Sequence, residues 1–119
     1  MTASAQDFNV YAGDDALPIF TVTDGATPPN PIPLQTAAEI EWIAYKDTSL
    51  ASALTKKKST GGVSFVTDGS NGQIKVAISN ADTAPLDGWF FHSAVVTDSN
   101  GNKTTFEVGR MAVLQRGTL

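Results

Sequence analysis

Hydrophobic and polar residues alternate along this chain over short segments that turn residues separate. Seven or so segments have the period of two that is typical of strands, and no segment keeps the 3.6-residue period of a long helix. This pattern predicts an all-β protein, in which two sheets form a sandwich or a small barrel. The expected strands cover residues 7–11, 17–23, 40–46, 54–58, 63–66, 73–79, 89–96 and 103–115.

Residues 78–98 contain the strand around which we expect the fold to be built. Ser79 and Asp82 have the spacing of a helix-capping box, so one short helical turn is predicted there. Pro85 is expected to end that turn, because it donates no backbone N–H. Residues 89–96 are then apolar at almost every position, which predicts a central strand covered on both faces.

Both tryptophans fall in expected strands, Trp42 in residues 40–46 and Trp89 at the start of residues 89–96. A tryptophan in a sandwich strand more often belongs to the core than to the surface. We therefore expect both indoles to lie between the two sheets. Exposed tryptophans on one face would instead suit a carbohydrate-binding or adhesive module, which is the alternative function for this chain.

The segments between strands add predictions of their own. Residues 28–33 contain four prolines and are expected to cross between the sheets as an extended loop rather than join a ladder. Lysines 56–58 are expected to guard an edge strand. Residues 68–72 and 98–102 predict hairpin turns. Gly109 is expected to mark a bulge, because the apolar phase of the last strand shifts after it.

Length and composition indicate one domain of 119 residues. We expect residues 1–6 to be a flexible N-terminal arm and residues 7–119 to be a single sandwich domain. The formal net charge of -4 argues against binding to nucleic acids or to anionic membranes. Cysteine is absent, and neither a signal-peptide pattern nor a membrane-spanning run is found, which favours folding in a reducing cytoplasm.

Metal sites are not predicted. Counted from Asp68 and Asp98, the twelfth position of a calcium loop falls on Ser79 and Gly109, whereas an EF-hand needs a bidentate glutamate there. His92 is the only histidine, and without cysteines it cannot build the usual zinc site. We therefore expect no metal and no cofactor.

Catalytic residues are not predicted either. No G-x-S-x-G serine is available to His92, which is expected to be structural, on the strand face opposite Trp89 and Phe91. Asp14 and Asp15 have the pairing of an acid and a base, but a solvated turn explains them better. No catalytic, cofactor-binding or metal-binding residue is therefore predicted, and the chain is not expected to be an enzyme.

A series of short motifs nevertheless occurs in a recognisable order. The motifs are Gly13-Asp14-Asp15, Pro18-Ile19-Phe20-Thr21-Val22, Pro31-x-Pro33-Leu34-x-Thr36-Ala37, Ile40-x-Trp42, Gly72-x-Ile74-x-Val76, Asp82-Thr83-Ala84-x-Leu86-x-Gly88-Trp89, Thr97-Asp98-x-x-Gly101 and Phe106. In their order, these motifs resemble the immunoglobulin-like N-terminal domain of the upper baseplate proteins of tailed phages and related small phage virion proteins.

The resemblance implies an immunoglobulin-like antiparallel β-sandwich of about seven strands. It also implies a virion building block, made in the host cytoplasm, that docks on other structural proteins of the tail, baseplate, neck or head. The partners are then other phage proteins in a symmetric multi-copy assembly, with no nucleic acid, membrane or small-molecule substrate.

Three departures from the family pattern limit which properties of the family are expected of this chain. Trp89 stands where the family has a tyrosine, so a tyrosine-corner hydroxyl is not expected. Residues 34–37 lack the glycine of the family's Leu-Thr-Gly-Ala-like segment. The chain also ends soon after the last expected strand, whereas the baseplate members continue into domains that hold a receptor-binding protein. A role in binding a host receptor is therefore not predicted.

Overall fold

Two sheets contain about half of the residues that the computed structural model describes, which are residues 7–23, 30–46 and 52–115. The predicted arm at residues 1–6, residues 28–29 of the proline-containing segment and residues 116–119 of the predicted domain lie outside these ranges. In chain order the elements are β1 (Phe8–Tyr11), β2 (Ile19–Thr21), β3 (Glu39–Tyr45), β4 (Ser52–Lys57), a 3-10 helix η1 (Lys58–Thr60), β5 (Val63–Phe65), β6 (Gln73–Val76), α1 (Asn80–Thr83), β7 (Gly88–Thr97) and β8 (Lys103–Leu114).

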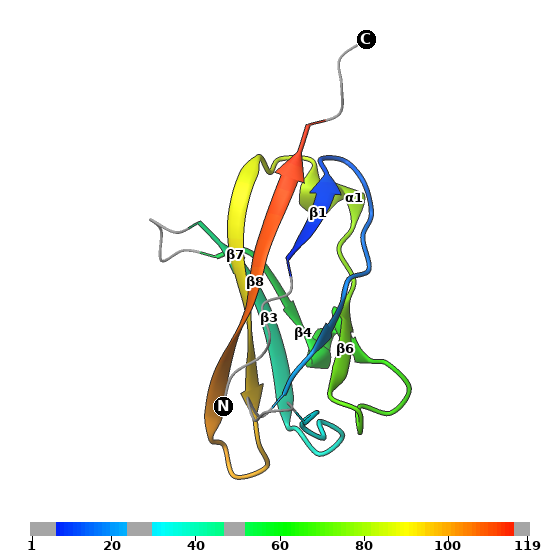
Figure 1. Cartoon of the computed structure of the whole chain (residues 1–119), viewed down its shortest axis with the longest axis vertical. Helices are drawn as coiled ribbons and strands as arrows, with labels where there is room; N and C mark the ends of the chain where they lie inside the picture. The colour runs from blue at the N-terminus through cyan, green and yellow to red at the C-terminus, as the bar shows by residue number, and fades with distance from the viewer. Residues whose placement is uncertain (1–6, 24–29, 47–51, 116–119) are drawn as a thin grey trace.

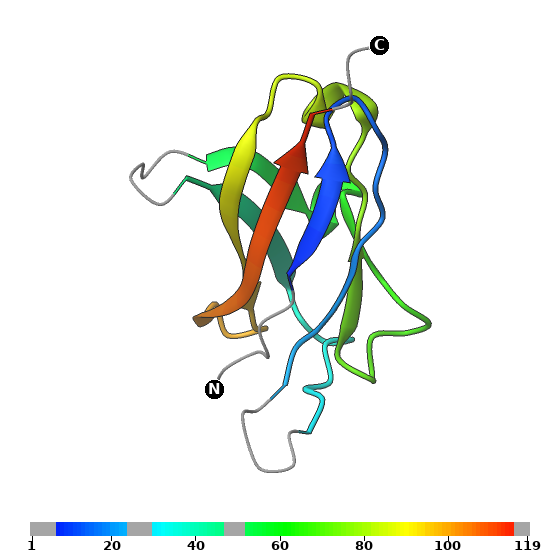
Figure 2. The same cartoon turned by 45° about the horizontal axis from the view of Figure 1, so that its top comes forward.

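The sheets have the strand orders β1-β8-β7-β3-β4 and β2-β6-β5, and they form two layers (Figure 1, Figure 2). Every pair is antiparallel except β1 with β8, which is parallel. The predicted all-β sandwich is confirmed, and each of the eight strands in the described part of the chain overlaps one of the expected ranges. No helix in that part is long or apolar enough to cross a membrane.

The core is formed by side chains at alternate positions of the strands. In β3, Ile40, Trp42 and Ala44 are fully buried while the residues between them are partly exposed. β6 repeats the pattern with Ile74 and Val76. Each fully buried large apolar side chain stabilises the fold by roughly 1.5–3 kcal/mol relative to an exposed one. The alternation predicted for these two strands is therefore confirmed.

The long hairpin of β7 and β8 contains the predicted bulge. The register shifts once, where Val108 of β8 has no partner on β7. Gly109 follows with φ of 126°, a backbone conformation that side-chain-bearing residues rarely adopt. Because of the extra residue, Phe106 before the bulge and Met111 after it both lie in the core.

The proline-containing segment departs from its prediction in one respect. It does connect the three-stranded sheet to the five-stranded sheet, as expected. However, Pro31 forms an isolated bridge with Thr23, and the Ile32 N–H donates to the Val22 carbonyl at 2.9 Å. The segment joins a short ladder because Ile32, unlike its proline neighbours, has an N–H to donate.

The edge strand predicted from lysines 56–58 is present. β4 lies at the end of the five-stranded sheet, with Lys56 and Lys57 near its end. Lys57 pairs with Glu41 of β3 at 3.5 Å, an exposed contact that contributes less than about 1 kcal/mol. The charged side chains discourage pairing with further strands.

The expectation that both tryptophans are buried is wrong for one of them. Trp42 is 0% exposed, but Trp89 is 64% exposed. Phe90, the next residue of β7, faces the core, so Trp89 lies on the outer face of the sheet. The apolar run of β7 had led to the expectation of a strand covered on both faces, but the outer face is open at Trp89. The expectation failed because apolar character does not by itself distinguish core positions from surface positions.

Trp42 belongs to a buried aromatic cluster that joins the sheets. Its indole Nε1–H donates to Nδ1 of His92 at 3.2 Å, and the His92 side chain is 0% exposed. Phe20 of β2 stacks on Trp42 with ring centroids 6.4 Å apart and lies 4.8 Å from His92. Phe8 of β1 meets the imidazole edge-on at 5.2 Å. The His92 side chain therefore lies on the inner face of β7, and Trp89 lies on the outer face, as predicted for His92.

We predict that Trp42→Phe lowers the free energy of unfolding by about 2–4 kcal/mol, because it removes both packed volume and the donor to His92. Trp89→Phe is the matched control and is expected to change stability by no more than about 0.5 kcal/mol, since its ring is exposed. Urea unfolding followed by circular dichroism measures both. Equal losses for the two variants would contradict the assignment of one core indole and one surface indole.

Candidate functional site

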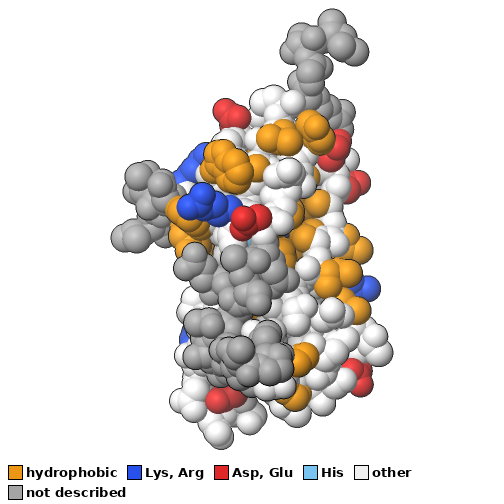
Figure 3. Space-filling view, viewed as in Figure 1, with side chains coloured by type: hydrophobic (Ala, Val, Ile, Leu, Met, Phe, Trp, Pro, Cys, Tyr) orange, Lys and Arg blue, Asp and Glu red, His pale blue; other side chains and the backbone are white. Residues whose placement is uncertain are grey.

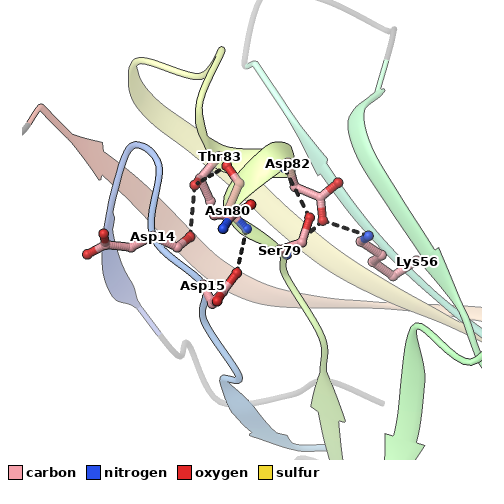
Figure 4. Close-up of polar contacts among 7 residues, drawn as sticks. All are labelled: Asp14, Asp15, Lys56, Ser79, Asn80, Asp82 and Thr83. Carbon is pink, nitrogen blue, oxygen red and sulfur yellow. Dashed lines mark hydrogen bonds and ion pairs between the residues drawn. The ribbon is translucent and has the colours of Figure 1, made fainter.

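The hydroxyl of Thr83 joins two segments about 70 residues apart in the chain. Thr83 is 0% exposed. Its Oγ1 accepts a hydrogen bond from the Gly13 N–H at 2.9 Å and donates to the Asp14 carbonyl at 2.9 Å, the latter visible in Figure 4. Gly13 has φ of 88°, a conformation that favours glycine. The loop after β1 is thereby fixed to α1.

Two carboxylates complete this contact. Asp15 Oδ1 accepts from the Asn80 N–H at 2.6 Å, which satisfies a backbone donor in the first turn of α1. The predicted capping box is present, with Ser79 Oγ accepting from the Asp82 N–H and Asp82 Oδ2 accepting from the Ser79 N–H. We call this set the α1 clasp; it comprises Gly13, Asp14, Asp15, Ser79, Asn80, Asp82 and Thr83.

Asp82 also extends the clasp to the five-stranded sheet. Lys56 of β4 pairs with Asp82 Oδ2 at 2.7 Å (Figure 4). Partial burial opposes ionisation of the carboxyl, but the hydrogen bonds from Lys56 and Ser79 outweigh it, and the pKa of Asp82 lies below its ordinary value. The carboxylate is thus held in its charged form by structural partners.

Of the paired aspartates, Asp15 takes part in the clasp through its carboxylate and Asp14 through its backbone carbonyl. Asp15 is exposed and Asp14 is partly exposed, in keeping with the predicted solvated turn. What the sequence did not indicate is that the Asp15 side chain caps a helix distant in the chain. Thr83 was named only within a motif, because a single hydroxyl residue carries no pattern that identifies a partner 70 positions away.

The two hairpin aspartates bind their own turns. Asp68 Oδ1 accepts from Ser70 N–H at 2.9 Å and from Ser70 Oγ–H at 2.6 Å, which lowers the pKa of Asp68. Asp98 Oδ1 accepts from the N–H groups of Asn100 and Asn102 at 2.9 and 3.0 Å. Within the described ranges, no three His, Asp or Glu side chains are grouped in a way that would hold a metal ion.

The outer face of the five-stranded sheet presents the most distinctive exposed chemistry. Trp89 has Ala112 as its register partner on β8, and Ala112 has Asn9 on β1. In the adjacent row, Phe91 faces Arg110, whose guanidinium lies 5.5 Å from the Phe91 ring centroid. We call this the Trp89 face; it comprises Asp7, Asn9, Trp89, Phe91, Arg110 and Ala112.

A notch of about 200 Å³ is lined by Trp89, Phe90, Phe91 and Arg110 within this face. Asp7 borders it, because its Oδ1 accepts from the Arg110 N–H at 2.9 Å. Figure 3 shows hydrophobic side chains gathered over the ends of β7, β8 and β1, with basic and acidic side chains beside them. Aromatic, cationic, anionic and small side chains therefore meet on one open surface.

A second exposed apolar surface lies on the other sheet. Leu17 and Ile19 are 59% and 53% exposed, and a groove of about 390 Å³ beside them is lined by residues 15–17 and 77–79. β2 is an edge strand of its sheet. We call Leu17, Ile19 and this groove the β2 surface.

Comparison with known proteins decides the fold. No protein-family model matches the sequence, and no curated protein is detectably similar to it. A crystal structure of a chicken TCR matches 96% of this chain with a TM-score of 0.59 and 14% identity. The chain has an immunoglobulin-like fold. It covers 55% of that receptor chain, so it spans about half of its length.

The first Ig-like domain of human CD48 antigen is a further match, with 12% identity, a TM-score of 0.44 and coverage of 98% of this chain and 88% of that one. At these identities, the likeness to solved structures concerns the fold alone. The resemblance is confirmed as far as the immunoglobulin-like sandwich, and its assignment to phage proteins stays a prediction.

We predict that Thr83→Val, which keeps the shape of the side chain, lowers the free energy of unfolding by about 1–3 kcal/mol, because it removes a buried hydroxyl with two backbone partners. Thr105→Val is the control, because Thr105 is an exposed residue of β8, and it should change the free energy of unfolding by no more than about 0.5 kcal/mol. Chemical denaturation compares the two. If both variants are as stable as the parent chain, the clasp does not hold the β1 loop.

We predict that Asp82→Asn costs about 1 kcal/mol at pH 7, through loss of the charged cap and its ion pair. Because the folded-state pKa is lowered, the stabilisation is fully present above the ordinary value of 3.8 and is lost as the pH falls through the lower folded-state pKa. The stability difference between parent and variant should therefore shrink below pH 3.8. Denaturation series between pH 7 and acidic pH test this; a constant difference would contradict it.

Proposed function

We propose that this immunoglobulin-like chain is a non-enzymatic building block of a bacteriophage virion that docks on other structural proteins. The α1 clasp is the observation that supports this proposal most. Gly13-Asp14-Asp15 and Asp82-Thr83-Ala84 belong to the motifs on which the phage resemblance depends, and they form one hydrogen-bonded unit. Motifs that make a single structural unit are better support for a relationship than scattered matches.

The environment of His92 supports a role without catalysis. The imidazole is enclosed by Trp42, Phe20 and Phe8, and its Nδ1 accepts from the indole. A general base must reach the proton that it removes, which an imidazole in this position does not. The carboxylates of Asp15, Asp68, Asp82 and Asp98 likewise accept hydrogen bonds from backbone N–H groups.

For a building block, the relevant surfaces are those that bind neighbours. We propose that the β2 surface receives an apolar segment of a neighbouring structural protein of the tail, baseplate, neck or head. Leu17 and Ile19 supply exposed apolar area beside a groove, and β2 has an outer edge without a paired strand among the described elements. Residues 1–6 and the proline-rich residues 28–33 are further proposed contacts, in a symmetric multi-copy assembly.

The proposal predicts that the protein is a constituent of purified particles of the phage that encodes it. Leu17→Glu with Ile19→Lys should reduce its copy number in those particles at least severalfold, because charge is placed in an apolar contact, while the free chain stays folded. Quantitative mass spectrometry of gradient-purified particles, with negative-stain images, measures the change.

Leu114→Glu is the matched control, since Leu114 is an exposed leucine on the opposite sheet, and particles should keep their normal content of this variant. Intact, infectious particles that never contain the protein would overturn the virion role. Normal content of the double variant at the β2 surface would leave the virion role standing but exclude that surface as the contact.

A further inference from the structure

The exposed indole of Trp89 is placed so that one side of the ring is available to a ligand. Its register partner Ala112 is only 3% exposed although it is not part of the core cluster, so neighbouring outer-face side chains cover it. The indole instead borders the notch that Phe90, Phe91 and Arg110 also line. Most of the Trp89 surface itself remains in water, an uncommon arrangement for so large an apolar side chain.

Hydrogen-bonding side chains surround this ring on the same face. Asn9, one strand beyond Ala112, carries an amide that both donates and accepts. Arg110 supplies only donors and Asp7 only acceptors. Arg110 is oriented by its contact with the Phe91 ring, and Asp7 is positioned by the bond that it accepts from the Arg110 N–H. Arg110 and Asp7 are thus held in place before any ligand binds.

The charges of the Trp89 face favour an uncharged ligand. Arg110 and Asp7 carry opposite charges and lie next to one another, so neither an anion nor a cation is preferred. A donor-only group, an acceptor-only group and an amide together match neighbouring hydroxyls, each of which donates and accepts. The apolar face of a sugar ring, in turn, matches the indole.

The spacing of the face also fits a ligand of that size. Adjacent strands lie about 4.8 Å apart, and side chains directly opposite one another are about 4.5–5.5 Å apart at Cβ. Arg110 is the diagonal neighbour of Trp89 on β8, at a separation of about 7–8 Å. A ring stacked on Trp89 beside the notch therefore has its hydroxyls within reach of Arg110.

From these observations we infer that the Trp89 face is a binding site for a neutral glycan, with one sugar ring stacked on Trp89 and its hydroxyls bonded by Asn9, Arg110 and Asp7. The site lies on the outer face of the five-stranded sheet, while the β2 surface belongs to the other sheet. The chain can then be attached through one sheet and bind a glycan through the other. The inference does not depend on the virion role, because glycan binding can be measured on the purified chain in the absence of any particle.

The direct test is titration of the full chain with neutral oligosaccharides of glucose, galactose, mannose and N-acetylglucosamine, followed by calorimetry and by acrylamide quenching of tryptophan fluorescence. We expect at least one of them to bind and to protect Trp89 from quenching. Trp89→Ala should weaken that binding about tenfold or more, and Arg110→Gln or Asn9→Ala about three- to tenfold, as expected for lost stacking or one lost hydrogen bond. Trp89→Phe, which keeps a ring, should bind better than Trp89→Ala.

Tyr11→Ala is the matched control, because Tyr11 is an exposed aromatic residue of the same sheet outside the Trp89 face, and its binding should be unchanged. The inference is overturned if no neutral oligosaccharide binds at about 10 mM, or if Trp89→Ala binds as the parent does. It is also overturned if sedimentation shows that the parent chain dimerises and Trp89→Ala dissociates the dimer, since the face then serves a second copy of the chain.

Discussion

The buried aromatic cluster around the hydrogen bond between the Trp42 indole and His92 packs the two sheets of the sandwich together. The hydrogen bond joins β3 to β7 inside the core, and the rings of Phe20 and Phe8 enclose it from β2 and β1. A buried polar group without a partner costs about 1–3 kcal/mol. The bond satisfies the indole N–H and Nδ1 of the imidazole, and His92, the only histidine of the chain, is enclosed in the sandwich core.

The α1 clasp acts at one end of the sandwich, where the chain passes between the two sheets. Thr83 fixes the loop after β1, and the ion pair of Lys56 with Asp82 connects α1 to β4. The side chains of Asp15, Asp82 and Thr83 are engaged in these structural bonds. The most exposed large apolar side chains of the described residues lie elsewhere, at the β2 surface and the Trp89 face.

Much of the fold follows from local sequence. The alternation at Ile40, Trp42 and Ala44, the capping box at Ser79 and the bulge at Gly109 each have a local cause and were predicted. The parallel pairing of β1 with β8 has no local signature, because register between distant strands is fixed by tertiary packing. The same is true of the Asp15 cap and of the position of Thr83.

Trp89 shows most clearly what sequence reasoning missed. An apolar run predicts a strand, but whether both faces are covered depends on which elements lie over them. The outward position of Trp89 follows from the alternation of β7 once Phe90 is known to face the core. The Trp89 face unites residues of three strands, so only the sheet order brings Asn9 and Asp7 beside the indole.

Hydrogen exchange of the two indole N–H groups, followed by ¹H–¹⁵N NMR in D₂O, tests most directly the division between one structural and one exposed tryptophan. The Trp42 signal should persist until the sandwich unfolds, because its N–H is buried and bonded to His92. The Trp89 signal should disappear within the dead time of the experiment. Two protected signals, or two that exchange at once, would contradict the arrangement described above.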